Sequence, residues 1–380
     1  MSQSLNRWND TFLLSKRRET DPLADDLVKT IIEKHQQQKF HELWKHLITN
    51  ESVDKALLPP EARQYFDETA RLPDFADHKL LIAGQEVFAR HGLACTTVLL
   101  CKSLPQTYAC GKGVEVLYQT GRLTSEEHMK RFTRRLMETA QFVINVMTPG
   151  GLDKDGRGMI SAQKVRLIHA SIRFYLKQKG WDLQKYDEPI NQEDMAGTLM
   201  AFSALVVQGL ELLNIRLTAD EKEAYIHTWK VVGHIMGVDP SLIPEDFRDA
   251  EALGEAIFQQ QMSPSDAGRV LTEACLEFLR EMMPLHMAEV PRAMVHHLIG
   301  PEASAAVGLK IKDNWLDKLT DSLIGHVFAH KDRDRPRHER LTILSEHLQT
   351  HLQQGMINFY NHHKQVMFYI PPSLRADWKN

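Results

Sequence analysis

The chain has 380 residues, of which 43% are hydrophobic and 25% charged, a composition typical of a globular protein. Its formal net charge of −4 gives no general case for nucleic acid or an anionic membrane as a partner. No two of its cysteines form a C-x-x-C pair, which argues against a zinc knuckle and against a thioredoxin-type redox site (Cys95, Cys101, Cys110 and Cys275).

The N-terminal sequence, MSQSLNRWNDTFLLSKRRETDPLADD, is polar and charged. It lacks the apolar run and the small-residue cleavage site of a secretory signal. We also find no stretch of about 18 apolar residues, so no membrane-spanning helix is expected. Together these features predict a protein of the reducing cytoplasm.

Helical patterns follow one another along the first half of the chain. Residues 25–48 have helical spacing with many Gln, Lys and Glu residues, and 78–104 reads as an apolar helix pair or one long buried helix that Pro105 stops. Residues 124–147 begin with a capping-type signal and end at TPGG. A turn-rich link then leads into the helix that contains 165–176.

The second half continues in the same way. Residues 191–215 are the most continuously apolar stretch, which predicts a helix buried on most sides, and 218–237 again start with a capping signal. Further helices are broken at MSPSD, HLIGPEAS and KDRDRPRHER, the last of which we expect to be an exposed charged loop. With no strand alternation and no repeat, the prediction is an all-α fold, with residues 1–60 as a loosely attached helical extension and 61–380 as the main domain.

The stretch VRLIHASIRFYL places a histidine on an apolar helix face. At about 100° per residue, His169 falls within the apolar stripe of this helix, while Arg166 and Arg173 lie together at its edge. A buried imidazole is a common metal ligand, and buried guanidinium groups require negative partners. One haem would satisfy all three, through its iron and its two propionates. The plainer alternative is a core histidine with two arginines that reach solvent.

A second polar pair lies one helix earlier, in RRLMETAQF. Arg135 and Thr139 are four residues apart and share a helix face near Phe132, Ala140 and Phe142. They are candidates for a polar pair in a cavity, placed to hydrogen-bond a cofactor or an oxygen species. The alternative is a threonine bonded to its own helix backbone and an arginine in solvent.

Five segments, in this order, carry a resemblance to a known family. They are SLPQTYACGKGVEVLYQTGRL (103–123), RRLMETAQFV (134–143), KVRLIHASIR (164–173), NQEDMAGTLMAFS (191–203) and WKVVGHIMGVDPSLIP (229–244). Over roughly residues 70–300 the chain resembles the latex clearing protein (rubber oxygenase) and MpaB-type haem oxygenase family. The resemblance implies a globin-like multi-helix bundle around one non-covalent haem b, with 61–380 as the catalytic domain.

The resemblance also implies roles for individual residues. His169 stands where the family has its proximal iron ligand, and Arg166, Arg173, Arg135 and Thr139 fall in the haem environment. The implied reaction is oxygenation of an apolar, unsaturated compound, an isoprenoid or a lipid, with dioxygen as the second substrate.

This chain departs from the family pattern at the distal side. The family's rubber cleavers use a glutamate there as a base, and by spacing its place is taken by Gln119, which cannot accept a proton at neutral pH; Glu115 is the alternative. The family also has a distal lysine, for which Lys102 and Lys112 are both candidates. Without an export signal, rubber itself is not the expected substrate.

Other classes of protein are the alternatives to an oxygenase. A haem-binding sensor or carrier without oxygenase turnover would be expected if the distal pocket were small or closed, and an interaction protein would be expected to lose the Arg-His-Arg set. Histidine pairs at 326 and 330 and at 347 and 351 have zinc-ligand spacing, but the chain has neither H-E-x-x-H nor E-x-x-H.

Overall fold

The structure, a computed structural model, describes residues 7–33, 56, 58–121, 125–282 and 288–310. No strand occurs within these residues, where Cys110 and Met262 form an isolated antiparallel bridge, and the all-α prediction is confirmed. In chain order the helices are α2 (Asp10–Lys16), α4 (Pro60–Thr69), α5 (His78–Val98), the π-helix η2 (Leu99–Ser103), α6 (Leu104–Tyr108), α7 (Val114–Gly121), α8 (Ser125–Met147), α9 (Arg157–Gln178), α10 (Leu183–Tyr186), α11 (Gln192–Phe202), α12 (Ala204–Leu212), α13 (Ala219–Ile235), the 3₁₀-helix η3 (Pro240–Leu242), α14 (Phe247–Gln261), α15 (Asp266–Glu281) and α16 (Val290–Ala306).

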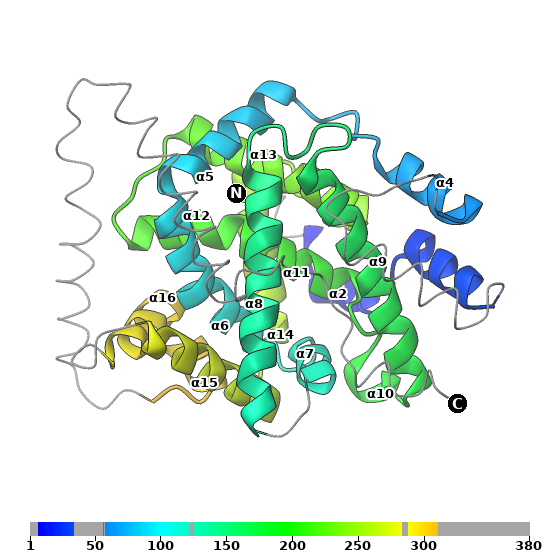
Figure 1. The fold of residues 1–380 in the computed structure, drawn as a ribbon. Coiled ribbons are helices and arrows are strands. Elements are labelled where there is room, and N and C mark those ends of the chain that lie inside the picture. The colour runs from blue at the N-terminus through cyan, green and yellow to red at the C-terminus, as the bar shows by residue number, and fades with distance from the viewer. Residues whose placement is uncertain (1–6, 34–55, 57, 122–124, 283–287, 311–380) are drawn as a thin grey trace.

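The main hydrophobic core lies where α5 and α13 cross and extends to α8, α11, α12, α14 and α15 (Figure 1). Trp229 of α13 is 1% exposed and stacks on Phe202, with their ring centroids 5.0 Å apart. At the crossing a Cβ on Gly84 would lie 2.3 Å from the carbonyl oxygen of Ala224, so glycine allows the two helices to approach this closely.

The apolar stretch 78–104 forms three consecutive helical elements. α5 is kinked at His91, and it continues through η2 into α6. The sequence predicted that Pro105 ends this helical run, but the run continues through it. Pro105 stands in the first turn of α6, where a missing N–H costs little.

The apolar stretch 191–215 also differs from the prediction of one helix. Ser203, with non-helical backbone angles, separates α11 from α12. Among the described residues, Gln192–Leu212 are long and apolar enough to cross a membrane, judged by length and composition alone. However, 72% of the most apolar 18-residue window in this stretch is buried inside the fold, as in the core helix of a globular protein.

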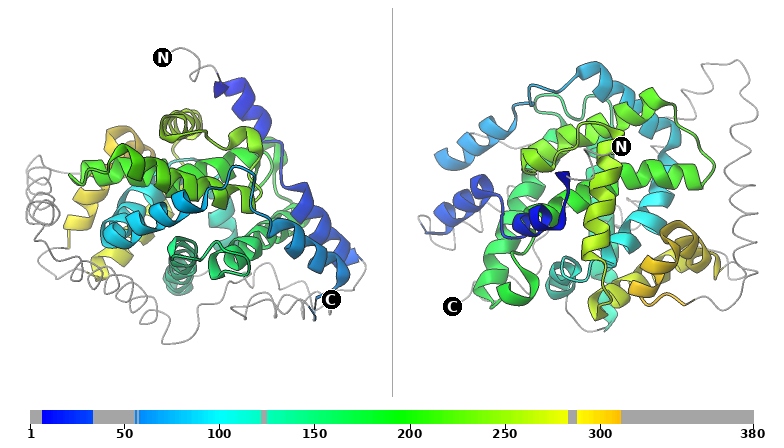
Figure 2. Two further views of the ribbon diagram at one scale, coloured as in Figure 1. Left: turned by 90° about the horizontal axis from the view of Figure 1, so that it is seen from above. Right: turned by 180° about the vertical axis from the view of Figure 1, so that it is seen from behind.

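Residues 7–33, the main described part of the N-terminal extension, are packed against the rest of the fold, which corrects the expectation of a loose attachment for this part. Trp8 and Leu13 are 3% and 0% exposed and belong to the main core. A helix over 22–33 packs with α4 and α9 in a second cluster, as the views from above and from behind in Figure 2 show. Members of this second cluster include Ala24, Val28, Ile31, Tyr65, Phe66 and Leu167. The division of the chain at residue 60 stays a prediction.

Some predicted features lie outside the described residues. These are the histidine pairs at 326 and 330 and at 347 and 351, the charged loop at 331–340, and the larger part of the helix predicted over 25–48. The break in HLIGPEAS is seen at Gly300, whose φ of +77° interrupts α16 before Pro301.

Candidate functional site

His169 lies in the middle of α9, on the side turned toward the protein interior. The side chain is partly buried, and its Nδ1 atom is buried without a hydrogen-bond partner in the described part of the chain. Burial, together with the charge of Arg173, lowers the pKa of His169 to about 3, so the ring is neutral at physiological pH. A neutral imidazole with an unpartnered buried nitrogen is the form that ligates metal ions, and such an atom calls for an explanation.

Arg166, one turn before the histidine, is already neutralised within the chain. Its Nε and Nη2 donate to the two carboxylate oxygens of Asp21 at 2.6 and 2.7 Å, and its Nη1 donates to the carbonyl of Ile235 at 3.1 Å. Gly237, with φ of +81°, leaves room for the guanidinium, because a Cβ there would lie 2.5 Å from Nε. Asp21 therefore pairs with two nitrogens of the Arg166 guanidinium in this structure, and a role of Arg166 toward a cofactor stays a prediction.

Arg173, one turn after the histidine, is only partly satisfied. Nε donates to Asp25 at 2.8 Å and Nη1 to the carbonyl of Ile190 at 3.2 Å, while Nη2 is buried and has no partner among the residues that the structure describes. Arg173 is 2% exposed, so water does not readily form a hydrogen bond with Nη2. α9 thus offers an imidazole nitrogen and a guanidinium nitrogen, on successive turns, that are both buried and unpartnered.

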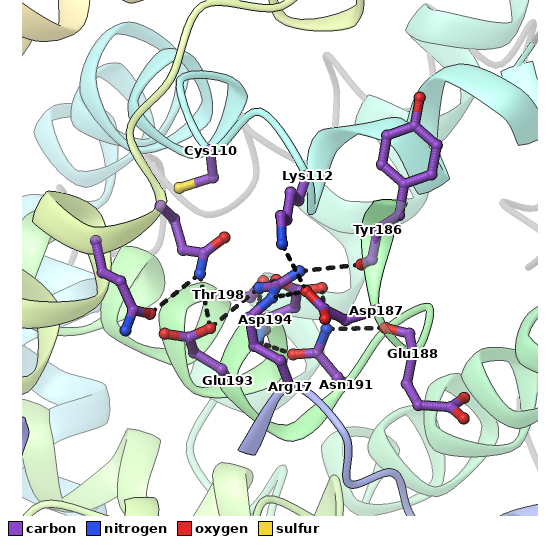
Figure 3. Close-up of polar contacts among 12 residues, drawn as sticks. Arg17, Cys110, Lys112, Tyr186, Asp187, Glu188, Asn191, Glu193, Asp194 and Thr198 are labelled. Atoms are coloured by element: carbon purple, nitrogen blue, oxygen red, sulfur yellow. Dashed lines mark hydrogen bonds and ion pairs between the residues drawn. The ribbon is translucent and has the colours of Figure 1, made fainter. Parts of the chain in front are cut away.

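Arg17 is the centre of a second buried charge cluster (Figure 3). It is fully buried and donates to Asp187 at 2.7 Å, Glu193 at 3.0 Å and Asp194 at 2.9 Å, while Lys112 donates to Asp187 at 3.0 Å. Burial raises the pKa of Glu193 to about 8, against the attraction of Arg17, so its carboxyl group is mostly protonated at neutral pH. Arg17 and Lys112 are the two cations of a group of three acidic side chains, and Arg17 contacts all three.

Three N-terminal residues hold the extension on the main domain through such ion pairs. Arg17, Asp21 and Asp25 recur every fourth residue. Arg17 pairs with carboxylates of the main domain, whereas Asp21 and Asp25 pair with the two arginines of α9, Arg166 and Arg173. The extension therefore supplies the counter-ions for the helix that carries His169. Sequence reasoning missed this role, although the four-residue spacing of these charged side chains was visible.

A small cavity of about 90 Å³ lies between α7, α8 and their neighbours. Arg135 and Thr139 both line it, and Arg135 donates from Nη1 to the carbonyl of Leu117 at 2.9 Å and from Nη2 to Oγ1 of Thr120 at 2.6 Å. The guanidinium therefore ties α8 to α7 at the cavity wall. The lining residues are Leu104, Tyr108, Leu117, Gly121, Arg131, Phe132, Arg135, Leu136, Thr139 and Leu271.

The three distal-side candidates are not brought together. Lys102 is buried, donates to the carbonyl of Leu298 at 3.0 Å, and has its pKa lowered to about 8 by burial. Lys112 belongs to the Arg17 cluster, and Gln119 donates from Nε2 to Glu115 at 2.9 Å. None of these residues is among the described residues that line the cavity. Their catalytic roles stay predictions.

Comparison with known proteins places the chain in a family. Residues 107–328 match the model of the family described as ER-bound oxygenase mpaB/B'/Rubber oxygenase, catalytic domain. The rubber oxygenase of Streptomyces sp. (strain K30) is 24% identical over 306 residues, which is 79% of this chain and 72% of the relative. The closed-state structure of latex clearing protein LCP superposes with a TM-score of 0.75 at 20% identity, over 94% of this chain and 95% of that one. The chain belongs to the mpaB/rubber oxygenase catalytic-domain family.

Proposed function

We propose that the protein is a haem b-dependent oxygenase that acts on an apolar, unsaturated substrate of the isoprenoid or lipid class. The observation that carries the proposal is the pair of unpartnered buried atoms on α9, Nδ1 of His169 and Nη2 of Arg173, in a chain of an oxygenase family. A bound haem would supply the activation of dioxygen. A cytoplasmic location is part of the proposal.

The α9 residues fit such a group by their chemistry. The neutral ring of His169 is a suitable iron ligand, and the free Nη2 of Arg173 is a suitable donor for one propionate carboxylate. Arg166 has a different role, because its bonds to Asp21 and to the carbonyl of Ile235 fix α9 to the N-terminal extension and to the end of α13. This arrangement holds the histidine in place before any cofactor arrives.

The cavity beside α8 is too small for a porphyrin, so it is proposed as part of the substrate side. At about 90 Å³ it is smaller than the ~150 Å³ that accommodates a benzene ring. Its leucine and phenylalanine side chains favour an apolar group, which agrees with the proposed substrate class. Arg135 and Thr139 shape its wall.

The absorption spectrum of the purified protein tests the cofactor directly. Expressed with ample haem precursor, the protein should show a Soret band and about one iron per chain, and acid solvent extraction should remove the chromophore because the haem is not covalently bound. The test of activity is dioxygen consumption with unsaturated lipids. A colourless, iron-free protein would end the proposal.

Arg135→Ala should loosen the cofactor without removing the chemistry. An arginine stays protonated at working pH, so it is a poor base, and its two described hydrogen bonds go to α7. Losing charge-assisted hydrogen bonds of roughly 1.5–3 kcal/mol should weaken haem retention by about 10- to 100-fold. Haem titration into the apo protein measures this, with the exposed Lys130→Ala as a matched control on the same helix.

Activity per bound haem distinguishes a role of Arg135 and Thr139 in haem retention from a role in the chemical step. In Arg135→Ala and in Thr139→Ala it should stay within about tenfold of the wild type. Normal haem loading together with a collapse of turnover per haem would instead assign the pair to the chemical step.

A further inference from the structure

Arg131 points an unsatisfied positive group at the cavity beside α8. It lines the cavity one turn before Arg135, and its Nη1 atom is buried without a hydrogen-bond partner among the described residues. A buried guanidinium nitrogen that has lost its water without gaining an acceptor costs on the order of 1–3 kcal/mol, and more for a charged group. Neither the family resemblance nor the sequence pattern pointed to this residue.

The described residues that line the cavity with Arg131 supply no negative charge. None of the described lining residues carries a carboxylate, and the two arginines among them, Arg131 and Arg135, carry like charges. Glu138, on the same helix, already accepts a hydrogen bond from Nε of Arg134 at 3.1 Å. The cavity is therefore apolar in its walls and positive at one end.

We propose that this cavity binds the carboxylate end of an amphiphilic substrate, with Arg131 as its principal partner. The ligand would be an unsaturated fatty or isoprenoid acid, and its apolar chain would begin against Phe132, Leu136 and Leu271. This deepens the proposed function, on which it rests for identifying the ligand as the substrate. Arg131 is then a specificity-determining residue.

A plain hydrocarbon fits this site poorly. A polyisoprene segment would cover Nη1 of Arg131 with apolar surface and leave its positive charge unpaired, which is unfavourable. A carboxylate instead provides two acceptor oxygens of the planar geometry that guanidinium groups bind well. The volume of about 90 Å³ admits a carboxylate and its first carbons, so the remainder of a long chain must lie outside the cavity.

The test compares geranic acid with geraniol, which have the same unsaturated ten-carbon skeleton and differ at the head group. Isothermal calorimetry on the full-length protein should show at least tenfold tighter binding of the acid. Arg131→Met should remove this preference by weakening acid binding at least tenfold and leaving alcohol binding within about twofold. Arg131→Lys should keep part of the preference for the acid, because lysine retains the positive charge but cannot donate two parallel hydrogen bonds to a carboxylate.

Lys130→Met is the matched control, since it removes one positive charge from the neighbouring, exposed position of the same helix. It should leave both affinities unchanged. Equal binding of acid and alcohol to the wild type, no binding of either, or an equal loss of both in Arg131→Met would each overturn the proposal. Thermal unfolding of the variants shows whether they are folded.

The same experiment separates this proposal from the haem proposal. The binding comparison has its own readout, and the Soret band is measured on the same preparations. Discrimination in favour of the acid in an iron-free protein would retain the carboxylate site and reject the oxygenase. A haem-loaded protein that binds acid and alcohol equally would reject the carboxylate site and leave the haem proposal standing.

Discussion

His169→Ala should lose haem more completely than a substitution of any other histidine. The ring is neutral, it lies on a buried helix face, and its Nδ1 has no partner within the described chain. An iron–imidazole bond is worth more than the roughly 1.5–3 kcal/mol of a charge-assisted hydrogen bond, so haem affinity should fall by about 100-fold or more. The measurement is haem titration into apo protein, followed at the Soret band.

Two other histidines on α13 are the controls for this experiment. His227 already accepts a hydrogen bond from the backbone N–H of Asp77 at 2.9 Å, and His234 packs edge-on against Phe75. Their alanine variants should load haem normally. In His169→Gly, added imidazole should restore the Soret band by filling the vacated position. Equal loading of His169→Ala and the wild type would move the ligand to another residue.

Arg17→Met should cause the largest loss of stability of any substitution at the ion pairs described above. The arginine is fully buried against three carboxylates, and its removal leaves Asp187, Glu193 and Asp194 with only Lys112 as a counter-charge among the described contacts. Breaking a buried pair by removing one partner costs about 3–5 kcal/mol. For a chain of 380 residues we expect the Tm to fall by roughly 4–6 °C in calorimetry.

The matched control is Arg269→Met, because Arg269 pairs with Asp266 on an exposed surface. That change should alter stability by less than about 1 kcal/mol. The double variant Arg17→Met, Asp194→Asn should recover part of the loss, since it removes one of the carboxylates that lose Arg17 as a partner. If Arg17→Met unfolds at the wild-type temperature, the cluster does not hold the N-terminal extension.

The sequence predicted the features that depend on neighbours within one helix. His169 stands out because its two flanking arginines and the apolar stripe are all within one turn or two of α9. The all-α class and the capping box at the start of α13, formed by Thr218 and Glu221, follow from equally local patterns. Periodicity and capping are short-range properties, so they can be read without a structure.

Long-range partners could not be predicted in this way. Nothing near Arg166 in the sequence indicates that Asp21 fills its fork, because the two are far apart in the chain. Arg131 was overlooked for the same reason, since the cavity it lines is formed by α6, α7, α8 and α15 together. The helix break at Ser203 could not be predicted either, because this residue lies within an apolar stretch whose hydropathy does not change there.

The ion pairs of the N-terminal extension also have a consequence for the order of events during synthesis. Asp21 and Asp25 are 145 and 148 residues ahead of their partners Arg166 and Arg173. At about 5–20 residues per second, a ribosome needs roughly ten to thirty seconds to make the intervening chain. During that interval Asp21 and Asp25 lack the arginines that they pair with in the fold. This segment is therefore made well before its partners and reaches its final place only after them.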